Sequence, residues 1–506
     1  MSTAKKFAGQ TAIYGLSTIA GRVLNFFLTP VYTSAYSTKV YGIFGNMYSY
    51  ASMLNALLAF GMETSFFRYL NKTPDKKAAV FNNSFGVIFF LSIVFLLITF
   101  PLSGLITTWI QIDPDTPFAE YIQYTRYFIG ILIVDAWCVI PFAKIRSEGR
   151  PGRYGTIKLL NIVLFVGLNL VFIYVLPYWV DHNFTGTTLI TPWFKRGWLG
   201  YVFLSNLIAS IATLLMLLPE LVKLRPKFDK GLLTEMLIYS FPVLIANFSF
   251  LINENLDKIL LGELLDEKIS ATQVGIYVAC AKISIFLSIF VNAFRLGAEP
   301  FFFSHAKNKN ASQTYARIMN YFVIAVCVIF VGLVANIEVL KYFIKGKDAE
   351  QTSLFWSGLN VVPILLFGYV SLGIYMNLSI WYKLSDQTKY GLYISGIGAI
   401  ITIVLNLIFI KPYGYMASAW ISLAAYSSMM ILSYIWGQKN YPIPYNLKKN
   451  LAYIISSALL VYISFYVFDR NIFIGNALLV MFASVALYFE WKNLSAIFIN
   501  NKQQPK

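Results

Sequence analysis

The sequence predicts an all-α membrane protein that crosses the bilayer about fourteen times. Hydrophobic residues make up 58% of the 506 residues, charged residues make up only 12%, and the mean hydropathy is +0.64. A water-soluble globular domain carries roughly 25% charged residues, so this composition is typical of a chain that lies mostly in lipid. Apolar stretches of about 20 residues, the length that spans a bilayer, also recur along the whole chain.

The predicted spans fall into two sets of six and a final pair. In chain order they lie at 8–36, 40–68, 80–104, 118–144, 154–178, 198–220, then 233–261, 272–303, 315–340, 354–382, 388–410, 413–437, and finally 450–468 and 472–490. We therefore predict a first six-helix lobe at 1–225, a second at 226–440, and a terminal transmembrane hairpin with a cytoplasmic tail at 441–506.

The basic residues are concentrated in alternate connections between these spans. Lys and Arg are dense at 68–77, 144–158 and 223–230, whereas the opposite connections hold as many acids as bases. By the positive-inside rule, the basic connections and both termini lie in the cytoplasm. The net charge of +17 is then explained by topology and by attraction to anionic lipids, and we expect no nucleic-acid partner.

Metal sites, disulfides and enzymatic chemistry are not predicted. Cys138, Cys280 and Cys327 each lie inside an apolar run, and the chain has only two histidines. No phosphate-binding loop or nucleophile elbow is present, and the connections are too short for a catalytic domain. We therefore expect a transporter without a bound cofactor.

An internal repeat relates the two sets of six spans. Residues 61–67 and 297–303 both read Gly-x-Glu-x-x-Phe-Phe, 236 positions apart. The run Leu-Asn-Leu at 168–170 returns at 405–407, 237 positions later. Because each unit has six spans, both units start on the same side, and a pseudo-two-fold axis along the membrane normal should relate them. The predicted cavity lies between the two lobes.

Polar residues inside the spans are the candidates for that cavity. A charge at bilayer depth costs at least a few kcal/mol unless it faces water or a partner. Arg22 and Asn25 share one polar face of the first span, and Asn247, Glu254 and Asp257 share a narrow arc of the span at 233–261. The alternative for Arg22 is a structural arginine that is paired within the bundle.

The neighbouring spans add further candidates. Asn55 lies in the span at 40–68. Asn292 and Arg295 lie on one face of the span at 272–303, and Arg295 precedes Glu299 by four positions. That spacing would allow an ion pair between the two. Lys282 lies on a different face of the same span from Arg295.

Two glutamates occupy equivalent positions of the repeat. Glu63 and Glu299 lie at the predicted cytoplasmic mouth of the cavity and could form an inner gate; alternatively, they tie helix ends to neighbouring groups. Asp135, Glu254 and Asp257 are candidates for exchanging a proton or Na⁺ with the cavity. The sequence does not choose between these ions.

Several motifs resemble those of one family. These are the 406–419 run Asn-Leu-Ile-Phe-Ile-Lys-Pro-Tyr-Gly-Tyr-Met-Ala-Ser-Ala, the Arg146-x-x-x-Arg150 stretch before Tyr154, and the first-span arginine. With the fourteen-span pattern, they resemble the bacterial polysaccharide-biosynthesis flippases of the multidrug/oligosaccharidyl-lipid/polysaccharide exporter superfamily.

The resemblance implies a function in the bacterial inner membrane. Such a flippase moves an undecaprenyl-diphosphate-linked oligosaccharide to the outer leaflet by alternating access, for O-antigen, capsule or exopolysaccharide assembly. Its partners are the lipid-linked substrate, membrane lipids and other polysaccharide-assembly proteins. Arg22 and Arg295 fit cavity arginines of such transporters. Lipid II flippases of the superfamily show more cavity arginines than this chain has, which argues against a peptidoglycan precursor.

Two other functions remain open. A cation-coupled multidrug extruder would have the same fold, but Arg22 and Arg295 would repel cationic drugs. A membrane glycan polymerase or ligase would be expected to carry a large outer loop with catalytic residues, and the outer connections here are short.

Overall fold

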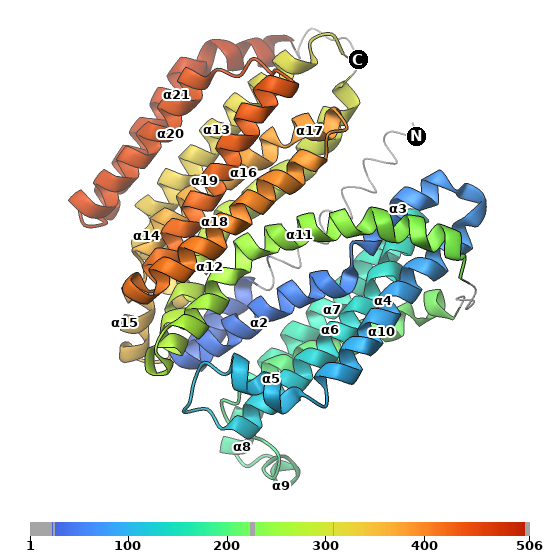
Figure 1. Cartoon of the computed structure of the whole chain (residues 1–506). Coiled ribbons are helices and arrows are strands. Elements are labelled where there is room, and N and C mark those ends of the chain that lie inside the picture. Colours follow the sequence, from blue (N-terminus) through green and yellow to red (C-terminus); the bar gives the residue numbers. More distant parts are fainter. Residues whose placement is uncertain (1–22, 24–25, 223–227, 307, 501–506) are drawn as a thin grey trace.

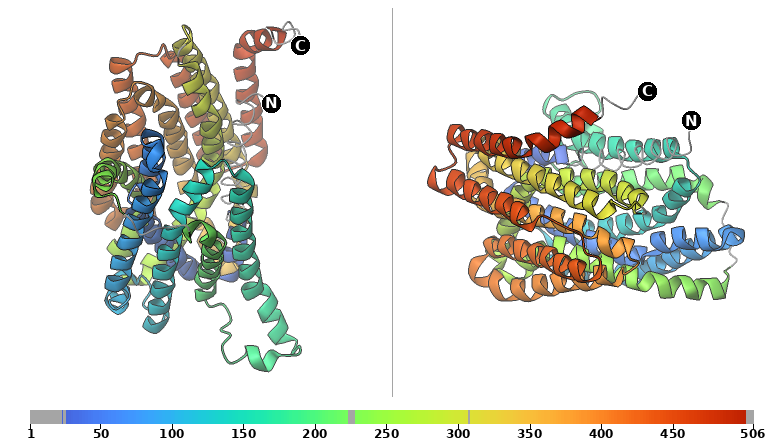
Figure 2. Two further views of the ribbon diagram at one scale, coloured as in Figure 1. Left: turned by 90° about the vertical axis from the view of Figure 1, so that its right-hand side faces the viewer. Right: turned by 90° about the horizontal axis from the view of Figure 1, so that it is seen from above.

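The computed structural model describes residues 23, 26–222, 228–306 and 308–500, and Figures 1 and 2 show it from three sides. The described part is helical, and it contains no β-strand. Its helices form one elongated bundle, as Figure 1 shows. The predicted all-α polytopic fold class is therefore confirmed.

The first half of the chain forms the helices drawn from blue to pale green. They are α2 (Thr38–Ala59), α3 (Met62–Lys72), α4 (Lys77–Thr99), α5 (Ser103–Ile110), α6 (Phe118–Ser147), α7 (Pro151–Leu170), α8 (Leu176–Asp181), α9 (Thr187–Ile190) and α10 (Gly200–Leu221). A π-helical turn at Val171–Val175 joins α7 to α8.

The second half forms the helices drawn from green to red. They are α11 (Lys230–Leu264), α12 (Glu267–His305), α13 (Ala311–Ala335), α14 (Ile337–Leu340), α15 (Ala349–Ser357), α16 (Val361–Leu378), α17 (Ile380–Leu384), α18 (Lys389–Tyr413), α19 (Tyr415–Asn440), α20 (Leu447–Tyr462) and α21 (Ile472–Asn500).

Twelve helices of the described part are long and apolar enough to cross a membrane. They match the third to the fourteenth predicted spans, so the protein is a multi-pass membrane protein. Of the two remaining spans, 8–36 lies largely outside the described residues, and 40–68 corresponds to α2 and α3. Although α2 is long enough to cross, it is too polar to be counted among the twelve, and the predicted number of fourteen is not confirmed.

Helices from the same half of the chain pack against one another. Helix α10 packs on α6 and α7, while α16 and α18 pack on α19. Helices α20 and α21 pack on α13 and form an outer edge of the bundle in Figure 1. The predicted lobe boundary near residue 226 stays a prediction, because α11 packs on α18 and also on α2 and α3.

Helices α2 and α12 make the closest contact between the two halves. A Cβ atom on Gly42 would lie 1.9 Å from the carbonyl oxygen of Ala271, and one on Gly275 would lie 2.0 Å from that of Thr38. Only glycine permits such an approach of two helix backbones. The side chain of Gln351 on α15 accepts hydrogen bonds from Thr38 N and Thr38 Oγ1, at 2.7 and 2.9 Å, and so fastens the start of α2 to the second half.

The two repeat units contain equivalent polar contacts. Asn169 donates to the Phe165 carbonyl, and Asn406, 237 positions later, donates to the Thr402 carbonyl; both hydrogen bonds are 2.7 Å long. Glu63 pairs with Arg146 on α6 at 2.5 Å, and Glu299 pairs with Lys383 on α17 at 2.7 Å. These matched pairs support the duplication that the sequence predicts.

Candidate functional site

A cavity of about 400 Å³ lies where the two halves of the bundle meet. Its volume falls in the range of about 300–1,000 Å³ that is usual for ligand sites. Residues from 28–32, α2, α7 and α10 form one side, and residues from α11, α12, α16 and α19 form the other. The polar and aromatic side chains that line it are Tyr32, Phe44, Tyr48, Ser49, Asn161, Phe165, Asn206, Asn253, Glu254, Asn255, Asp257, Lys258, Tyr277, Lys282, Tyr369, Ser422 and Tyr426.

A buried carboxylate organises the α11 side of the cavity. Asp257 is only 2% exposed. Its Oδ1 accepts from Lys258 Nζ at 2.9 Å and from Lys258 N at 2.8 Å, and its Oδ2 accepts from the Tyr277 hydroxyl on α12 at 2.6 Å. Taking a carboxylate out of water is costly unless a counter-charge and hydrogen bonds replace the lost hydration. Here one ammonium group, one amide and one hydroxyl supply that compensation.

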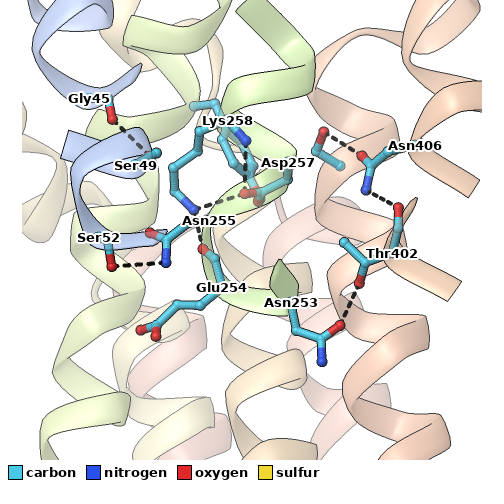
Figure 3. Close-up of polar contacts among 12 residues, drawn as sticks. Gly45, Ser49, Ser52, Asn253, Glu254, Asn255, Asp257, Lys258, Thr402 and Asn406 are labelled. Atoms are coloured by element: carbon cyan, nitrogen blue, oxygen red, sulfur yellow. Dashed lines mark hydrogen bonds and ion pairs between the residues drawn. The ribbon is translucent and has the colours of Figure 1, made fainter. Parts of the chain in front are cut away.

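Lys258 is held on its own helix. Besides Asp257, its ammonium group donates to the Glu254 carbonyl at 2.5 Å, one turn earlier in α11 (Figure 3). The Asn46 amide on α2 donates to the Lys258 carbonyl at 3.2 Å, which ties this turn to the first half of the chain. The charge of Lys258 is therefore largely neutralised by Asp257 in this structure.

Two other charged side chains of the cavity have no such partner. Neither the Lys282 ammonium group nor the Glu254 carboxylate makes a hydrogen bond or ion pair with any residue that the structure describes. Lys282 comes from α12 and Glu254 from α11. The cavity thus offers one free cation and one free anion within its described lining.

The opposite side of the cavity is polar but carries no charge in the described chain. Asn206 on α10 donates to the Tyr48 hydroxyl on α2 at 2.9 Å. Asn161 on α7 donates to Thr213 Oγ1 at 2.9 Å. The rings of Phe44 and Tyr48 pack together with their centroids 4.7 Å apart. Amide and phenol groups held in this way can still donate and accept hydrogen bonds toward a ligand.

A chain of neutral side chains continues from the cavity into the second half. Thr402 on α18 donates to Asn253 Oδ1 at 2.8 Å, and Asn406 and Ser418 extend the chain between α18 and α19, as Figure 3 shows in part. All four side chains are at most 2% exposed. Because these groups satisfy one another, this network fixes the position of α11 on α18.

The structure brings together two of the predicted site residues. Glu254 and Asp257 line the cavity, whereas Asn55, Asn247 and Asn292 do not. Asn247 is exposed, and Asn292 donates to the Ser288 carbonyl of its own helix at 2.8 Å. Arg22 and Asn25 lie outside the described residues.

Arg295 lines a different, much smaller cavity of about 20 Å³ together with Glu299 and Lys383. Its Nη1 lies 4.0 Å from the sulfur of Met376. The i,i+4 spacing suggested an ion pair of Glu299 with Arg295 on the same helix. In the structure, Glu299 forms an ion pair with Lys383 on α17. Lys282 and Arg295 line different cavities.

The predicted gate and coupling residues are distributed over the bundle. Glu63 and Glu299 each pair with a base from their own half of the chain, so a gate formed by the two remains a prediction. Asp135 on α6 is not part of the cavity lining, whereas Glu254 and Asp257 are.

Lys258, the ion-pair partner of Asp257, was not among the predicted site residues. Lys258 lies inside the predicted span at 233–261, directly after Asp257 and four residues after Glu254. That spacing is itself a signal, because it allows the ammonium group to reach both positions. The pairing of Tyr48 with Asn206 had no comparable signal, since it joins residues 158 positions apart.

The described part of the chain holds no group of three or more His, Cys, Asp or Glu side chains that could bind a metal ion. The three cysteines are buried and unpaired.

Comparison with known proteins gives the chain its relatives. The model of the polysaccharide biosynthesis protein family matches residues 184–304. No curated protein matches the sequence significantly. Among solved structures, the chain resembles the lipid II flippase MurJ in an inward closed conformation, with a TM-score of 0.70 at 13% identity over 94% of this chain and 99% of that chain.

A multidrug resistance MATE family transporter of the MOP superfamily is also similar. Its inward-facing conformation gives a TM-score of 0.65 at 12% identity over 83% of this chain and 94% of that chain. Its outward-facing conformation gives 0.59 at 13% identity over 85% and 95%. The family match over residues 184–304 and the fold shared with MurJ and the MATE transporter agree with the resemblance drawn from the sequence.

Proposed function

We propose that the chain is a flippase that moves an undecaprenyl-diphosphate-linked oligosaccharide across the bacterial cytoplasmic membrane, for the assembly of a surface polysaccharide. The observation that carries the proposal is the composition of the cavity. A space within a membrane-crossing bundle is lined by ammonium groups as well as by amides, hydroxyls and aromatic rings. Such a lining suits a ligand that has both an anionic group and sugar hydroxyls.

The binding groups follow from the contacts described above. Lys282 has its charge available for a diphosphate, whereas Lys258 would first have to leave Asp257. The asparagines and tyrosines would hydrogen-bond sugars, and the lipid tail would remain in the bilayer. Both termini would lie in the cytoplasm, in agreement with the distribution of Lys and Arg.

Alternating access is supported by the contact between α2 and α12. Their backbones approach each other closely at Gly42 and Gly275, and α15 packs on both helices, so the two halves meet at that end of the bundle. The higher TM-score with the inward-facing than with the outward-facing MATE transporter agrees with this contact. Export would require α2 and α12 to separate at these two glycines.

Ion coupling would use Glu254. Its carboxylate lies in the same cavity as the proposed diphosphate site and has no counter-ion among the described residues, whereas Asp257 already has one. A diphosphate would repel this carboxylate, and binding a proton or Na⁺ would relieve that repulsion.

The test is a flipping measurement in proteoliposomes with a fluorescent polyprenyl-diphosphate oligosaccharide. We expect the wild-type chain to move it, Lys282→Gln to lose most of the activity, and Lys439→Gln to keep it, because Lys439 is an exposed lysine at the end of α19 outside the cavity. Export by Lys282→Gln at the wild-type rate would contradict the proposed role of Lys282. No glycan movement by the wild type would contradict the function itself.

A multidrug extruder is the second candidate, because the unpaired Glu254 carboxylate could attract a cationic drug. The same vesicles loaded with a cationic dye separate the two functions. Dye transport that is lost in Glu254→Gln but insensitive to Lys282→Gln would favour the extruder.

A further inference from the structure

The cavity has two chemically different walls. We call the side formed by Tyr32, Phe44, Tyr48, Ser49, Asn161, Phe165 and Asn206 the neutral wall. We call the side formed by Asn253, Glu254, Asn255, Asp257, Lys258, Tyr277, Lys282, Tyr369, Ser422 and Tyr426 the charged wall. Every charged side chain in the described lining belongs to the charged wall. The neutral wall comes entirely from the first half of the chain, and the charged wall entirely from the second.

We infer that the two walls bind different parts of one substrate molecule: the diphosphate binds at Lys282 on the charged wall, and the first sugars bind to the neutral wall. This assignment rests on the proposed function and adds the location of each subsite. It places the anion subsite on the described residues of the second half and the glycan subsite on the described residues of the first half.

The neutral wall is suited to an uncharged polar ligand. A diphosphate that bound there would lose its hydration and gain no counter-charge from the described side chains. Removing a charged group from water without a counter-charge costs free energy. Sugar hydroxyls, in contrast, need neutral donors and acceptors. The Tyr48 hydroxyl accepts from Asn206 and has no acceptor for its own hydrogen among the described residues. That hydrogen can be donated to a sugar oxygen.

Aromatic rings add a surface for the apolar face of a sugar. Phe44, Tyr48 and Phe165 line the neutral wall and are each partly exposed. Aromatic side chains with a polar tip, such as Tyr48, can contact the apolar and the polar parts of a ligand at the same time.

The charged wall has one cation that is ready for an anion. Asp257 and Lys258 neutralise each other at 2.9 Å. The free Glu254 carboxylate comes from α11 and would repel a phosphate, whereas the free Lys282 ammonium group comes from α12. The diphosphate should therefore bind on the α12 side of this wall, where Lys282 is the unpaired cation.

The experiment compares two soluble probes on the full chain in lipid nanodiscs. The first probe is farnesyl diphosphate, and the second is farnesyl diphosphate that carries one N-acetylglucosamine. The affinity gained by adding the sugar measures the glycan subsite, and the affinity of the first probe measures the anion subsite. Tyr48→Phe removes one hydroxyl group, Lys282→Gln removes one charge, and Lys439→Gln is the matched lysine control.

We expect Lys282→Gln to weaken both probes by the same factor of about tenfold, the size of one charge-assisted hydrogen bond. Tyr48→Phe should leave farnesyl diphosphate unchanged and weaken only the sugar-bearing probe, by about fivefold, the size of one neutral hydrogen bond. The double variant should show the product of the two effects, because separate subsites act independently. Unchanged melting temperatures would show that each variant is folded.

Three results would overturn the assignment. Tyr48→Phe could weaken both probes equally, Lys282→Gln could weaken only the sugar-bearing probe, or the wild type could bind the two probes with equal affinity. Loss of farnesyl diphosphate binding in Arg22→Gln but not in Lys282→Gln would likewise place the anion on the other half. If the wild type bound neither probe but bound a cationic dye, the proposed function itself would fail, and this outcome differs from the other four.

Discussion

The two copies of the Gly-x-Glu-x-x-Phe-Phe motif have different backbones. In the first copy the helix is interrupted at Phe60 and Gly61, whose φ angles are 48° and 65°, and α3 begins after them. In the second copy α12 continues through Gly297. A Cβ on Gly61 would lie 2.8 Å from the Ser240 carbonyl oxygen of α11, whereas a Cβ on Gly297 would meet nothing within 4 Å. The same motif thus has a helix break where α11 lies close to the backbone and a continuous helix where no neighbour does.

The side chains of the two copies behave alike despite this difference. Glu63 and Glu299 each form an ion pair with a base 83 and 84 positions later. The duplicated sequence thus preserved a polar contact while the backbone diverged. Substitutions at equivalent positions of the two motif copies can separate the effect of the shared ion pair from the effect of α11 on the backbone of the first copy.

The largest effect is expected where α2 of the first half touches α12 of the second half. Gly42→Val and Gly275→Val would each drive a side chain into a backbone carbonyl of the facing helix, at 1.9 and 2.0 Å for the first carbon alone. We expect each to lower the free energy of unfolding by roughly 1–3 kcal/mol, or to hold α2 and α12 apart. Thermal unfolding in detergent, together with the flipping rate, would measure this. Wild-type values for both variants would show that α2 and α12 are not in contact in the membrane.

The next effect should have opposite signs in the two copies. Gly61→Ala places a side chain at positive φ and against α11, so a loss of about 1–3 kcal/mol is expected. Gly297→Ala replaces glycine inside a regular helix with free space around it, so a gain of up to about 1 kcal/mol is expected. Chemical or thermal unfolding of the two variants side by side would decide the matter. Equal effects of the same sign would mean that both copies have the same backbone.

A smaller effect is expected at the two ion pairs. The carboxylate side chains of Glu63 and Glu299 are 43% and 36% exposed. Pairs that are this accessible to solvent contribute about 0–1 kcal/mol, so Glu63→Gln and Glu299→Gln should change the melting temperature little. If the two form the inner gate, both variants should nevertheless reduce glycan flipping. Reduced flipping in only one of them would show that the copies differ in function.

The smallest effect concerns the docking of α11 on the first copy. Lys76 donates to Asp229 at 2.8 Å, and this contact, with the Leu232 amide, holds the pKa of the Asp229 carboxyl below its usual value of about 3.9. A lowered pKa in the folded state means that the pairing stabilises the protein above that usual value and is lost as the pH falls through the folded-state pKa.

Asp229→Asn keeps a residue that can cap the start of α11 and removes only the charge. The variant should therefore melt slightly below the wild type at pH 7, and the difference should shrink as the pH falls below the usual carboxyl pKa of about 3.9. Melting curves at several pH values would measure it. A difference that grew toward low pH would contradict the proposed role of the carboxylate.

The sequence was sufficient for the fold but only partly for the site. Apolar length and periodicity located twelve of the predicted spans, because each depends on local composition. The break at Gly61 could not be predicted, because it depends on Ser240, a residue 179 positions away. Asp257 and Glu254 were found because a charge inside an apolar span is rare.

The rest of the cavity depends on packing between distant helices. The polar face of a helix predicts which residues point away from lipid, but it does not predict which neighbouring helix they contact. Asn292 bonds back to its own helix, and Arg295 faces α16 and α17 instead of the central cavity. The contact of Lys258 with Asp257 joins adjacent residues, so the sequence alone could predict it.

The composition of the charged wall has a consequence for energetics. Its charged side chains are two acids, Glu254 and Asp257, and two bases, Lys258 and Lys282, so their formal charges cancel within the described lining. Within the described lining, an empty cavity would then move no net charge when the bundle reorients, whereas a bound diphosphate would move its own negative charge, less one unit if Glu254 takes up a proton or Na⁺. Each elementary charge that crosses 100 mV exchanges about 2.3 kcal/mol with the membrane potential. An interior-negative potential would thus favour the loaded, outward half of the cycle over the empty return, as far as the described lining determines the charge that moves.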